Sequence, residues 1–136
     1  MKIFLVSALI VILMTVSLLA ATDPTAVMMR YFSNTKNQYE NINIVSYQGF
    51  KISENCLENQ PPKCEAWIAL QEKVTPQNSA TPYIGNPAAR YCFDHNANNQ
   101  VLFDKQKKEF DYCMFKDGSA VSAWDLYNKH FGTSKK

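Results

Sequence analysis

The chain lacks a long apolar run beyond Ala21. From residue 22 onwards the longest uninterrupted apolar stretch is residues 66–70, whereas a membrane-crossing helix needs about 20 apolar residues. A long amphipathic helix with a basic face, which would bind at a membrane surface, is also missing. This part of the chain is therefore not expected to insert into a membrane or to lyse one.

The chain also lacks a basic stripe. Its formal net charge is +2 in 136 residues, and its lysines cluster only at residues 105–108 and 135–136, where a solvated turn and tail are the simpler interpretation. Nucleic-acid binding would require a basic patch along one face. We therefore expect no nucleic acid among its partners.

Closely spaced cysteines are absent as well. The cysteines are Cys56, Cys64, Cys92 and Cys113, and even the nearest two are too widely spaced for the close pairs, such as Cys-x-x-Cys, that zinc sites use. We predict no metal and no cofactor. Cys92 and His95 lie one helical turn apart, but no residue that would orient His95 for thiol catalysis is evident.

What is present begins with an export signal. Lys2 precedes an uncharged run over residues 3–21 that ends at the small residues Ala20 and Ala21, which is the pattern of a signal peptide. The run is longer than the usual core of about 7–15 residues, so an uncleaved inner-membrane anchor is the alternative. No cysteine lies in or just after the run, which excludes a lipid attached there. We expect a secreted or periplasmic protein.

An even number of cysteines in an exported chain indicates disulfides. Four cysteines allow three pairings, and spacing does not choose among them. Locality favours Cys56–Cys64 and Cys92–Cys113. Such bridges would contribute about 2.6 and 3.4 kcal/mol in the chain-entropy model.

The segment 22–74 mixes helix and strand signals. Asp23 and Pro24 open a predicted helix over residues 25–32, with residues 33–40 as a loop. Alternating apolar residues predict strands at 41–47 and 50–53, joined by a Gln48-Gly49 turn. Residues 54–63 form a loop, and residues 65–74 favour a helix, with a buried strand as the alternative. Residues 75–85 are predicted to be a linker or long loop.

The pattern is clearer over residues 86–132. Asn86 and Pro87 predict the start of a helix that continues to His95. Residues 100–104 and 109–115 predict a hairpin, and Gly118 a turn with positive φ. Ser119 is expected to cap a last helix whose Trp124 packs over the disulfide. No internal repeat is found in the sequence.

These elements predict an α+β fold. We expect a small disulfide-stapled domain with a helix–β-hairpin–helix unit at residues 86–132 and an N-terminal α/β segment whose fold the pattern does not define. Residues 133–136 are expected to form a tail.

Residues 86–132 resemble a small exported bacterial domain family of unknown function that is often labelled "putative hemolysin". The resemblance is carried by Asn-Pro-Ala, then Cys, a charged hairpin, aromatic-x-Cys-x-Phe, Asp-Gly-Ser and a Trp. These residues are Asn86, Pro87, Ala88, Cys92, Tyr112, Cys113, Phe115, Asp117, Gly118, Ser119 and Trp124. The resemblance implies a bacterial envelope or extracellular protein and brings no catalytic residues.

The chain departs from this family at two cysteines. Members often carry one just after the Asp-Gly turn, where this chain has Val121, and one near the C-terminus, where it has none. Loss of both is expected if they pair with each other. The resemblance therefore implies that Cys92 pairs with Cys113.

The function that these observations favour is a non-enzymatic interaction module that binds an envelope or extracellular protein. One alternative is an inhibitor of a secreted protease or lysozyme, since a rigid loop loses little entropy on docking. The candidate interaction loop closed by Cys56 and Cys64 consists of Glu58, Asn59, Gln60, Pro61, Pro62 and Lys63.

An enzyme is less favoured, because catalytic carboxylates need burial or a charged partner and the sequence indicates neither. We therefore predict no catalytic residues. The side chains that an enzyme would have available are Asp94, Asp104, Asp111, Asp117, Asp125, His95 and His130.

Overall fold

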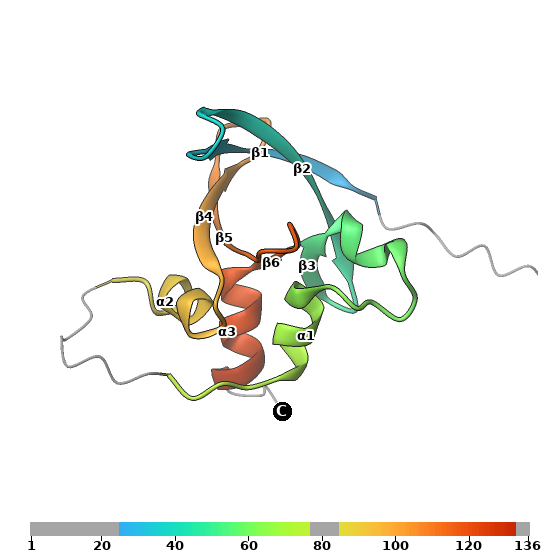
Figure 1. The fold of residues 1–136 in the computed structure, drawn as a ribbon, viewed down its shortest axis with the longest axis vertical. Coiled ribbons are helices and arrows are strands. Elements are labelled where there is room, and N and C mark those ends of the chain that lie inside the picture. Colours follow the sequence, from blue (N-terminus) through green and yellow to red (C-terminus); the bar gives the residue numbers. More distant parts are fainter. Residues whose placement is uncertain (1–24, 77–84, 133–136) are drawn as a thin grey trace, which may run out of the picture.

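The computed structural model describes residues 25–76 and 85–132. In these ranges six antiparallel strands close a barrel in the order β1-β2-β3-β6-β5-β4 (Figure 1). The strands are β1 (Val27–Ser33), β2 (Gln38–Tyr47), β3 (Phe50–Ser53), β4 (Asn98–Phe103), β5 (Glu109–Met114) and β6 (Ala120–Ser122).

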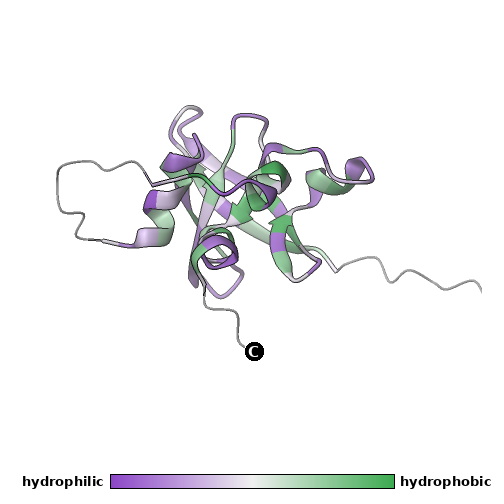
Figure 2. Cartoon of the chain, turned by 90° about the horizontal axis from the view of Figure 1, so that it is seen from below, coloured by the Kyte–Doolittle hydropathy of each residue, from purple (hydrophilic) through white to green (hydrophobic). Residues whose placement is uncertain are grey.

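The helices lie together at one end of the barrel, with α3 between α1 and α2 (Figure 1). Their bounds are α1 (Glu65–Gln71), α2 (Pro87–Asp94) and α3 (Ala123–Phe131), and a 3₁₀ turn, η1 (Glu54–Glu58), follows β3. Hydrophobic segments gather in the middle of the molecule, with polar segments around them (Figure 2).

The expected α+β fold with a helix–hairpin–helix unit is therefore wrong. The hairpin of β4 and β5 does not stand alone, because β1 pairs with β4 at Arg30↔Phe103 and β3 pairs with β6 at Ile52↔Val121. Segments that the sequence separates, residues 25–74 and 86–132, share one closed sheet. The prediction that disulfides staple a small domain is confirmed.

Two groups of apolar side chains fill the molecule. One lies within the barrel and contains Met29, Ile44, Leu102, Tyr112 and Ala120. The other lies between the barrel and the helices, and its fully buried members include Ile52, Leu70, Tyr91, Val121 and Leu126. Alternate residues of one strand serve the two groups, because successive side chains point to opposite faces. Ile44 and Val45 are an example.

The predicted helix over residues 25–32 is a strand. Val27 to Ser33 form β1, which pairs with β2 along its whole length. Val27, Tyr31 and Phe32 are β-branched or aromatic residues that favour a strand, and the long-range pairing decides between the two states. The proposed helix opening at Asp23 and Pro24 lies outside the described residues.

The predicted capping role of Ser119 is also wrong. A short strand, β6, follows the Asp117-Gly118 turn, and Ser122 caps α3 by accepting a hydrogen bond from the Asp125 backbone N–H at 3.3 Å. Gly132 follows the last residue of α3.

Several local predictions agree with the structure. Asn86 caps α2 through its side-chain oxygen, and Pro87 is the first helical residue. Gly49 and Gly118 have φ of 83° and 80°, which turns of this kind require. Residues 65–71 form α1, which supports the helix interpretation over the strand.

Candidate functional site

The candidate interaction loop lies between a buried and a partly exposed cysteine. Cys56, in η1, is 1% exposed. Cys64 is partly exposed and precedes α1, and the Cα atoms of the pair are 5.2 Å apart. Between them Glu58, Asn59, Gln60, Pro61 and Lys63 are exposed and Pro62 is buried. The bridge therefore fixes both ends of a loop whose side chains face solvent.

The loop is supported by the surface beneath it. Tyr47 donates a hydrogen bond to Gln60 Oε1 at 3.5 Å, and Gln60 Nε2 donates to the Leu57 carbonyl. The Tyr47 ring also makes a T-shaped contact with the Trp67 ring, with centroids 5.1 Å apart. Cys64 Sγ accepts the Trp67 backbone N–H at 3.2 Å, which caps α1. These contacts restrict the conformations of the loop before any partner binds.

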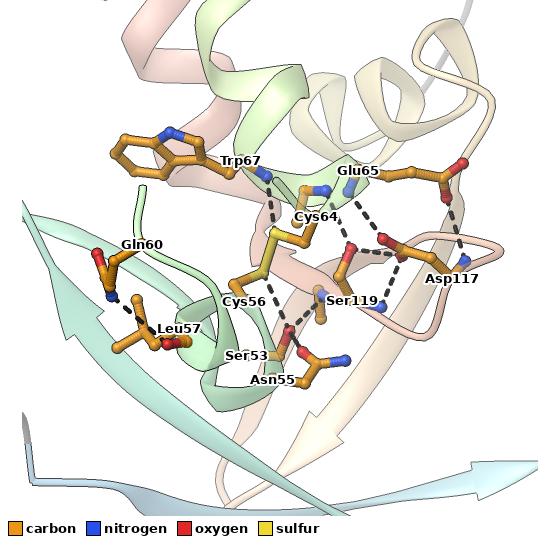
Figure 3. Close-up of a disulfide and its surroundings, with 12 residues drawn as sticks. Ser53, Asn55, Cys56, Leu57, Gln60, Cys64, Glu65, Trp67, Asp117 and Ser119 are labelled. Carbon is orange, nitrogen blue, oxygen red and sulfur yellow. Dashed lines mark hydrogen bonds between the residues drawn. A yellow bond between two sulfur atoms is a disulfide. The ribbon is translucent and has the colours of Figure 1, made fainter. Parts of the chain in front are cut away.

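A polar network anchors the start of α1 to the second half of the chain (Figure 3). Asp117 Oδ2 accepts the Glu65 N–H at 2.8 Å, and Ser119 Oγ accepts the Ala66 N–H at 3.0 Å. In return the Glu65 carboxylate accepts the Asp117 N–H. Ser53 Oγ accepts the Ala120 N–H at 2.8 Å. The Asp-Gly-Ser sequence thus holds the helix on which the loop ends.

The electrostatics of Asp117 follow from this network. Partial burial raises the pKa of Asp117, but hydrogen bonds from the Glu65 N–H and from Ser119 outweigh it and hold the pKa below its usual value. Within its own turn, Asp117 Oδ1 accepts the Ser119 N–H at 2.9 Å. Its second role, on α1, was missed because Glu65 lies far from it in the sequence.

A polar pocket of about 490 Å³ lies beside the loop base. Its lining includes Tyr31, Asn41, Asn43, Glu54 and Glu58. Asn43 Nδ2 donates to Glu54 Oε2 at 2.7 Å. The pocket offers amide and carboxylate groups, so it suits a ligand group rich in hydrogen-bond donors.

The other predicted structural residues lie away from the loop. Cys92 on α2 is joined to Cys113 on β5, and both are fully buried. Asn86 also donates to Asp111 Oδ2 at 2.8 Å. Trp124 does not lie over the bridge as expected, because it is 45% exposed and its ring contact is with Tyr127. Leu126, two positions further on, is buried in that core instead.

The carboxylates that an enzyme would use are dispersed over the fold. Asp104 accepts N–H groups of its own turn, Asp111 accepts Asn86 and Asn99, and Asp125 accepts the Lys51 N–H at 2.8 Å. Burial raises the pKa of Asp125 against the lowering effect of Lys51. Asp94 ends α2 and lines a pocket that also contains His95. The geometry thus gives these carboxylates structural partners and does not bring them into one site.

The two histidines do lie together, which the sequence did not predict. Their ring centroids are 5.7 Å apart, and the hydroxyl of Tyr91, a residue of α2, lies 2.7 Å from His130 Nδ1 on α3. His130 Nε2 lies 3.2 Å from the Leu70 carbonyl, so the neutral Nε2–H tautomer satisfies both contacts. Spacing alone offered no signal, because the histidines are far apart in the sequence.

Protonation of this pair is unfavourable. Burial, followed by the neighbouring His130, lowers the pKa of His95 to about 4 against the opposing effect of Asp94. Burial also lowers the pKa of His130. His95 Nε2 is buried and has no hydrogen-bond partner among the described residues. Within residues 25–76 and 85–132 no group of three or more potential metal ligands is found.

Comparison with known proteins finds one family model that matches part of the chain. The model of the family described as Domain of unknown function (DUF333) matches residues 83–130, which contain α2, β4, β5, β6 and most of α3. The chain therefore contains a stretch similar to a small domain of unknown function. No curated protein and no solved structure matches the chain. The hemolysin label is not shown by these comparisons.

The cysteines give the clearest information about the compartment. All four are paired as Cys56–Cys64 and Cys92–Cys113, and such bridges are typical of an oxidising, extracytoplasmic environment. In the described parts of the chain, no helix has the length and apolar character needed to cross a membrane. The predicted signal, residues 1–21, lies outside the described residues.

Proposed function

We propose that this protein is an exported, non-enzymatic interaction module that binds another envelope or extracellular protein through the Cys56–Cys64 loop. The observation that carries the proposal is the arrangement of this loop. Most of its side chains are exposed, and a disulfide holds its two ends together. A loop ordered before binding loses little conformational entropy when it docks.

The surroundings of the loop support a protein partner. Tyr47, Phe50 and Trp67 form an aromatic group next to the loop, in which Trp67 makes T-shaped contacts with the other two rings. Ile68, the next residue of α1, is 44% exposed. Aromatic side chains beside polar loop residues are typical of protein interfaces. The partner is expected to present donors or positive charge toward Glu54 and Glu58.

The alternative within this proposal is an inhibitor of a secreted protease or lysozyme. The same rigid loop favours it, because a pre-ordered segment that fits an active-site cleft binds tightly without being remodelled. A panel of secreted proteases and lysozymes assayed with the oxidised protein separates the two versions. Inhibition that requires the intact Cys56–Cys64 bridge supports the inhibitor, and no inhibition across the panel removes it.

The decisive experiment compares two triple variants of the oxidised, exported protein. The first changes Glu58, Gln60 and Lys63 of the loop to Ala. The matched control changes Glu109, Gln106 and Lys105, which are exposed residues of the same three types near the β4–β5 turn. Partners are captured from envelope extract by cross-linking, and their affinity for each variant is then measured.

Loss of about tenfold or more in affinity for the loop variant, with the control unchanged, is the expected result, since contacts at a hot spot contribute above about 1 kcal/mol each. Equal binding by wild type and both variants would show that the loop is not the interface. A substrate conversion that depends on His95 or His130 would instead favour an enzyme.

A further inference from the structure

The barrel consists of two three-stranded units that occupy equivalent positions. One unit is β1-β2-β3 and the other is β4-β5-β6, and each is an antiparallel meander. The units meet first strand to first strand, β1 with β4, and third strand to third strand, β3 with β6, both antiparallel. Antiparallel contact between equivalent strands is the pattern of a twofold axis.

The pairing register agrees with this twofold relation. The seam pairs make Arg30 equivalent to Phe103 and Ile52 equivalent to Val121. Because Arg30 is equivalent to Phe103, the preceding residue Met29 is equivalent to Leu102. Met29 pairs with Ile42 and Leu102 pairs with Phe110, so Ile42 is equivalent to Phe110. In the same way, the equivalence of Ile52 and Val121 makes Ser53 equivalent to Ser122. Ser53 pairs with Ile44 and Ser122 pairs with Tyr112, so Ile44 is equivalent to Tyr112.

Both routes therefore give the same alignment of β2 with β5. Ile42 and Ile44 are next-but-one neighbours on β2, just as Phe110 and Tyr112 are on β5. The two seams lie on opposite sides of each meander, so they supply independent estimates of this alignment. A slip of one residue in any ladder would destroy the agreement.

Equivalent residues also occupy equivalent environments. Met29 and its counterpart Leu102 are buried inside the barrel, as are Ile44 and Tyr112. On the other face of the sheet, Val45 and Cys113, and likewise Ile52 and Val121, are buried under the helices. The residue types differ within each of these four pairs, so the repeat is not visible in the sequence.

The family model matches only one of the two units. Residues 83–130 include the second meander, whose outer strands are β4 and β6. In this chain β1 covers the edge of β4 and β3 covers the edge of β6, and one residue pair joins the two strands at each seam. A sheet with two open edges readily pairs with further strands. The first half of the chain therefore acts as the binding partner of the matched unit.

The contacts between the halves have the character of a protein interface. Polar contacts cross it, including Lys51 N–H to Asp125 Oδ2 at 2.8 Å and Ala120 N–H to Ser53 Oγ at 2.8 Å. The apolar group under the barrel also combines residues of both halves, such as Leu70 and Leu126. Both disulfides lie within a half, so the polypeptide between residues 76 and 85 is the sole covalent connection.

We infer that this interface between the half-barrels can be formed by two copies of the chain, in which the first half of each copy completes the second half of the other. The occupant is a second copy because the surface on residues 85–132 is complementary in register, core and polar contacts to residues 25–76. Exchange of identical elements between protomers preserves the native contacts between the halves. The resulting dimer presents two Cys56–Cys64 loops, which raises avidity for a repeated partner.

The first test uses the unaltered oxidised chain. The protein is unfolded without reductant, refolded over a range of concentrations, and measured by size exclusion with light scattering. The dimer fraction is expected to rise with protein concentration during refolding and to persist on dilution. A protein that remains monomeric at every refolding concentration would overturn the inference.

The second test places thiols on the two sides of one seam. A chain carrying Arg30→Cys and a differently tagged chain carrying Phe103→Cys are mixed, unfolded and refolded together, and cross-linked dimers are mapped by mass spectrometry. Mixed dimers are expected at about tenfold or more over either self-dimer, because paired strands hold the thiols at about millimolar effective concentration. Random collision would give only twice as many, which would contradict exchange.

A matched control pairs Arg30→Cys with Tyr39→Cys. Tyr39 is exposed and lies near Arg30, whose guanidinium is 4.9 Å from its ring centroid. It belongs to the same half as Arg30, however, so exchange does not bring the two thiols of different chains across a seam. Enrichment of this mixed dimer to the same extent would show nonspecific thiol contact and overturn the inference.

Discussion

The two disulfides act at different depths of the molecule. Cys92–Cys113 joins α2 to β5 and both residues are fully buried. Cys56–Cys64 closes a surface loop, and Cys64 is partly exposed. The first therefore stabilises the core of one half-barrel, whereas the second positions a loop and the start of α1. Covalent stabilisation acts within each half, and noncovalent contacts join the halves.

The largest expected effect is removal of the buried bridge. Replacing Cys92 and Cys113 with Ala should lower the free energy of unfolding by about 3–5 kcal/mol, from the lost loop-closure restraint and the lost core contacts. Replacing Cys56 and Cys64 with Ala should cost about 2–3 kcal/mol, because a shorter loop is closed. Urea unfolding of both variants measures the difference. The reverse order would show that the surface bridge is the main structural one.

The next largest loss of stability is expected at Ser119, whose hydrogen bond joins the two halves. Ser119→Ala removes the acceptor of the Ala66 N–H, and the residue is fully buried. We expect a loss of about 1–3 kcal/mol in unfolding free energy, since a buried donor is left unsatisfied. Ser122→Ala, which removes the cap of α3 within one half, serves as the comparison at about 1 kcal/mol. Equal effects would argue against a special role for the network in Figure 3.

Because the pKa values of His95 and His130 are lowered in the fold, we expect the protein to lose stability in mild acid. The pKa of His95 in the folded protein is about 4, below its usual value of 6.5, so the fold favours the neutral ring. Stability from this group is complete above pH 6.5 and declines as the pH falls toward 4. At about 1.4 kcal/mol per pKa unit, and allowing for partial exposure, the loss is about 1–2 kcal/mol.

Urea unfolding at pH 7.0, 5.5 and 4.5 measures this loss, with His95→Gln as the control. The lowered pKa of His130 acts in the same direction, so the control should reduce the decline without abolishing it. An identical pH profile for wild type and His95→Gln would show that His95 is not responsible.

The smallest effect is expected at the loop tip. Glu58→Ala and Gln60→Ala change exposed side chains and should alter unfolding free energy by less than about 0.5 kcal/mol. Binding to a captured partner should nevertheless fall. A loop variant that loses both stability and binding would show that the loop has a structural role. That result would contradict the view that Cys92–Cys113 stabilises the core whereas Cys56–Cys64 only positions the loop.

Local features of the fold could be predicted from sequence because neighbouring residues determine them. Asn86 and Pro87 start α2, and Gln48-Gly49 turns β2 into β3, through backbone preferences that need no distant contact. The disulfide pairing was favoured by locality and, for Cys92–Cys113, implied by the family resemblance, and the structure contains both bridges.

Closure of the barrel could not be predicted in this way. The strand β6 is short, and its seam with β3 joins Ile52 to Val121 across much of the chain, so no local period marks it. For β1, apolar spacing was compatible with a helix, and only the ladder with β2 along its whole length selects a strand. The candidate loop was found from its cysteines, whereas its supports on Tyr47 and Asp117 depend on tertiary contacts.

The uneven burial of the cysteine residues predicts an order of reduction. Cys64 is partly exposed, whereas Cys56, Cys92 and Cys113 are buried. We therefore expect reduction of the native protein to begin at the loop and to leave the bridge between α2 and β5 intact. In a compartment of changing redox state, the loop would become unconstrained while the barrel stays folded.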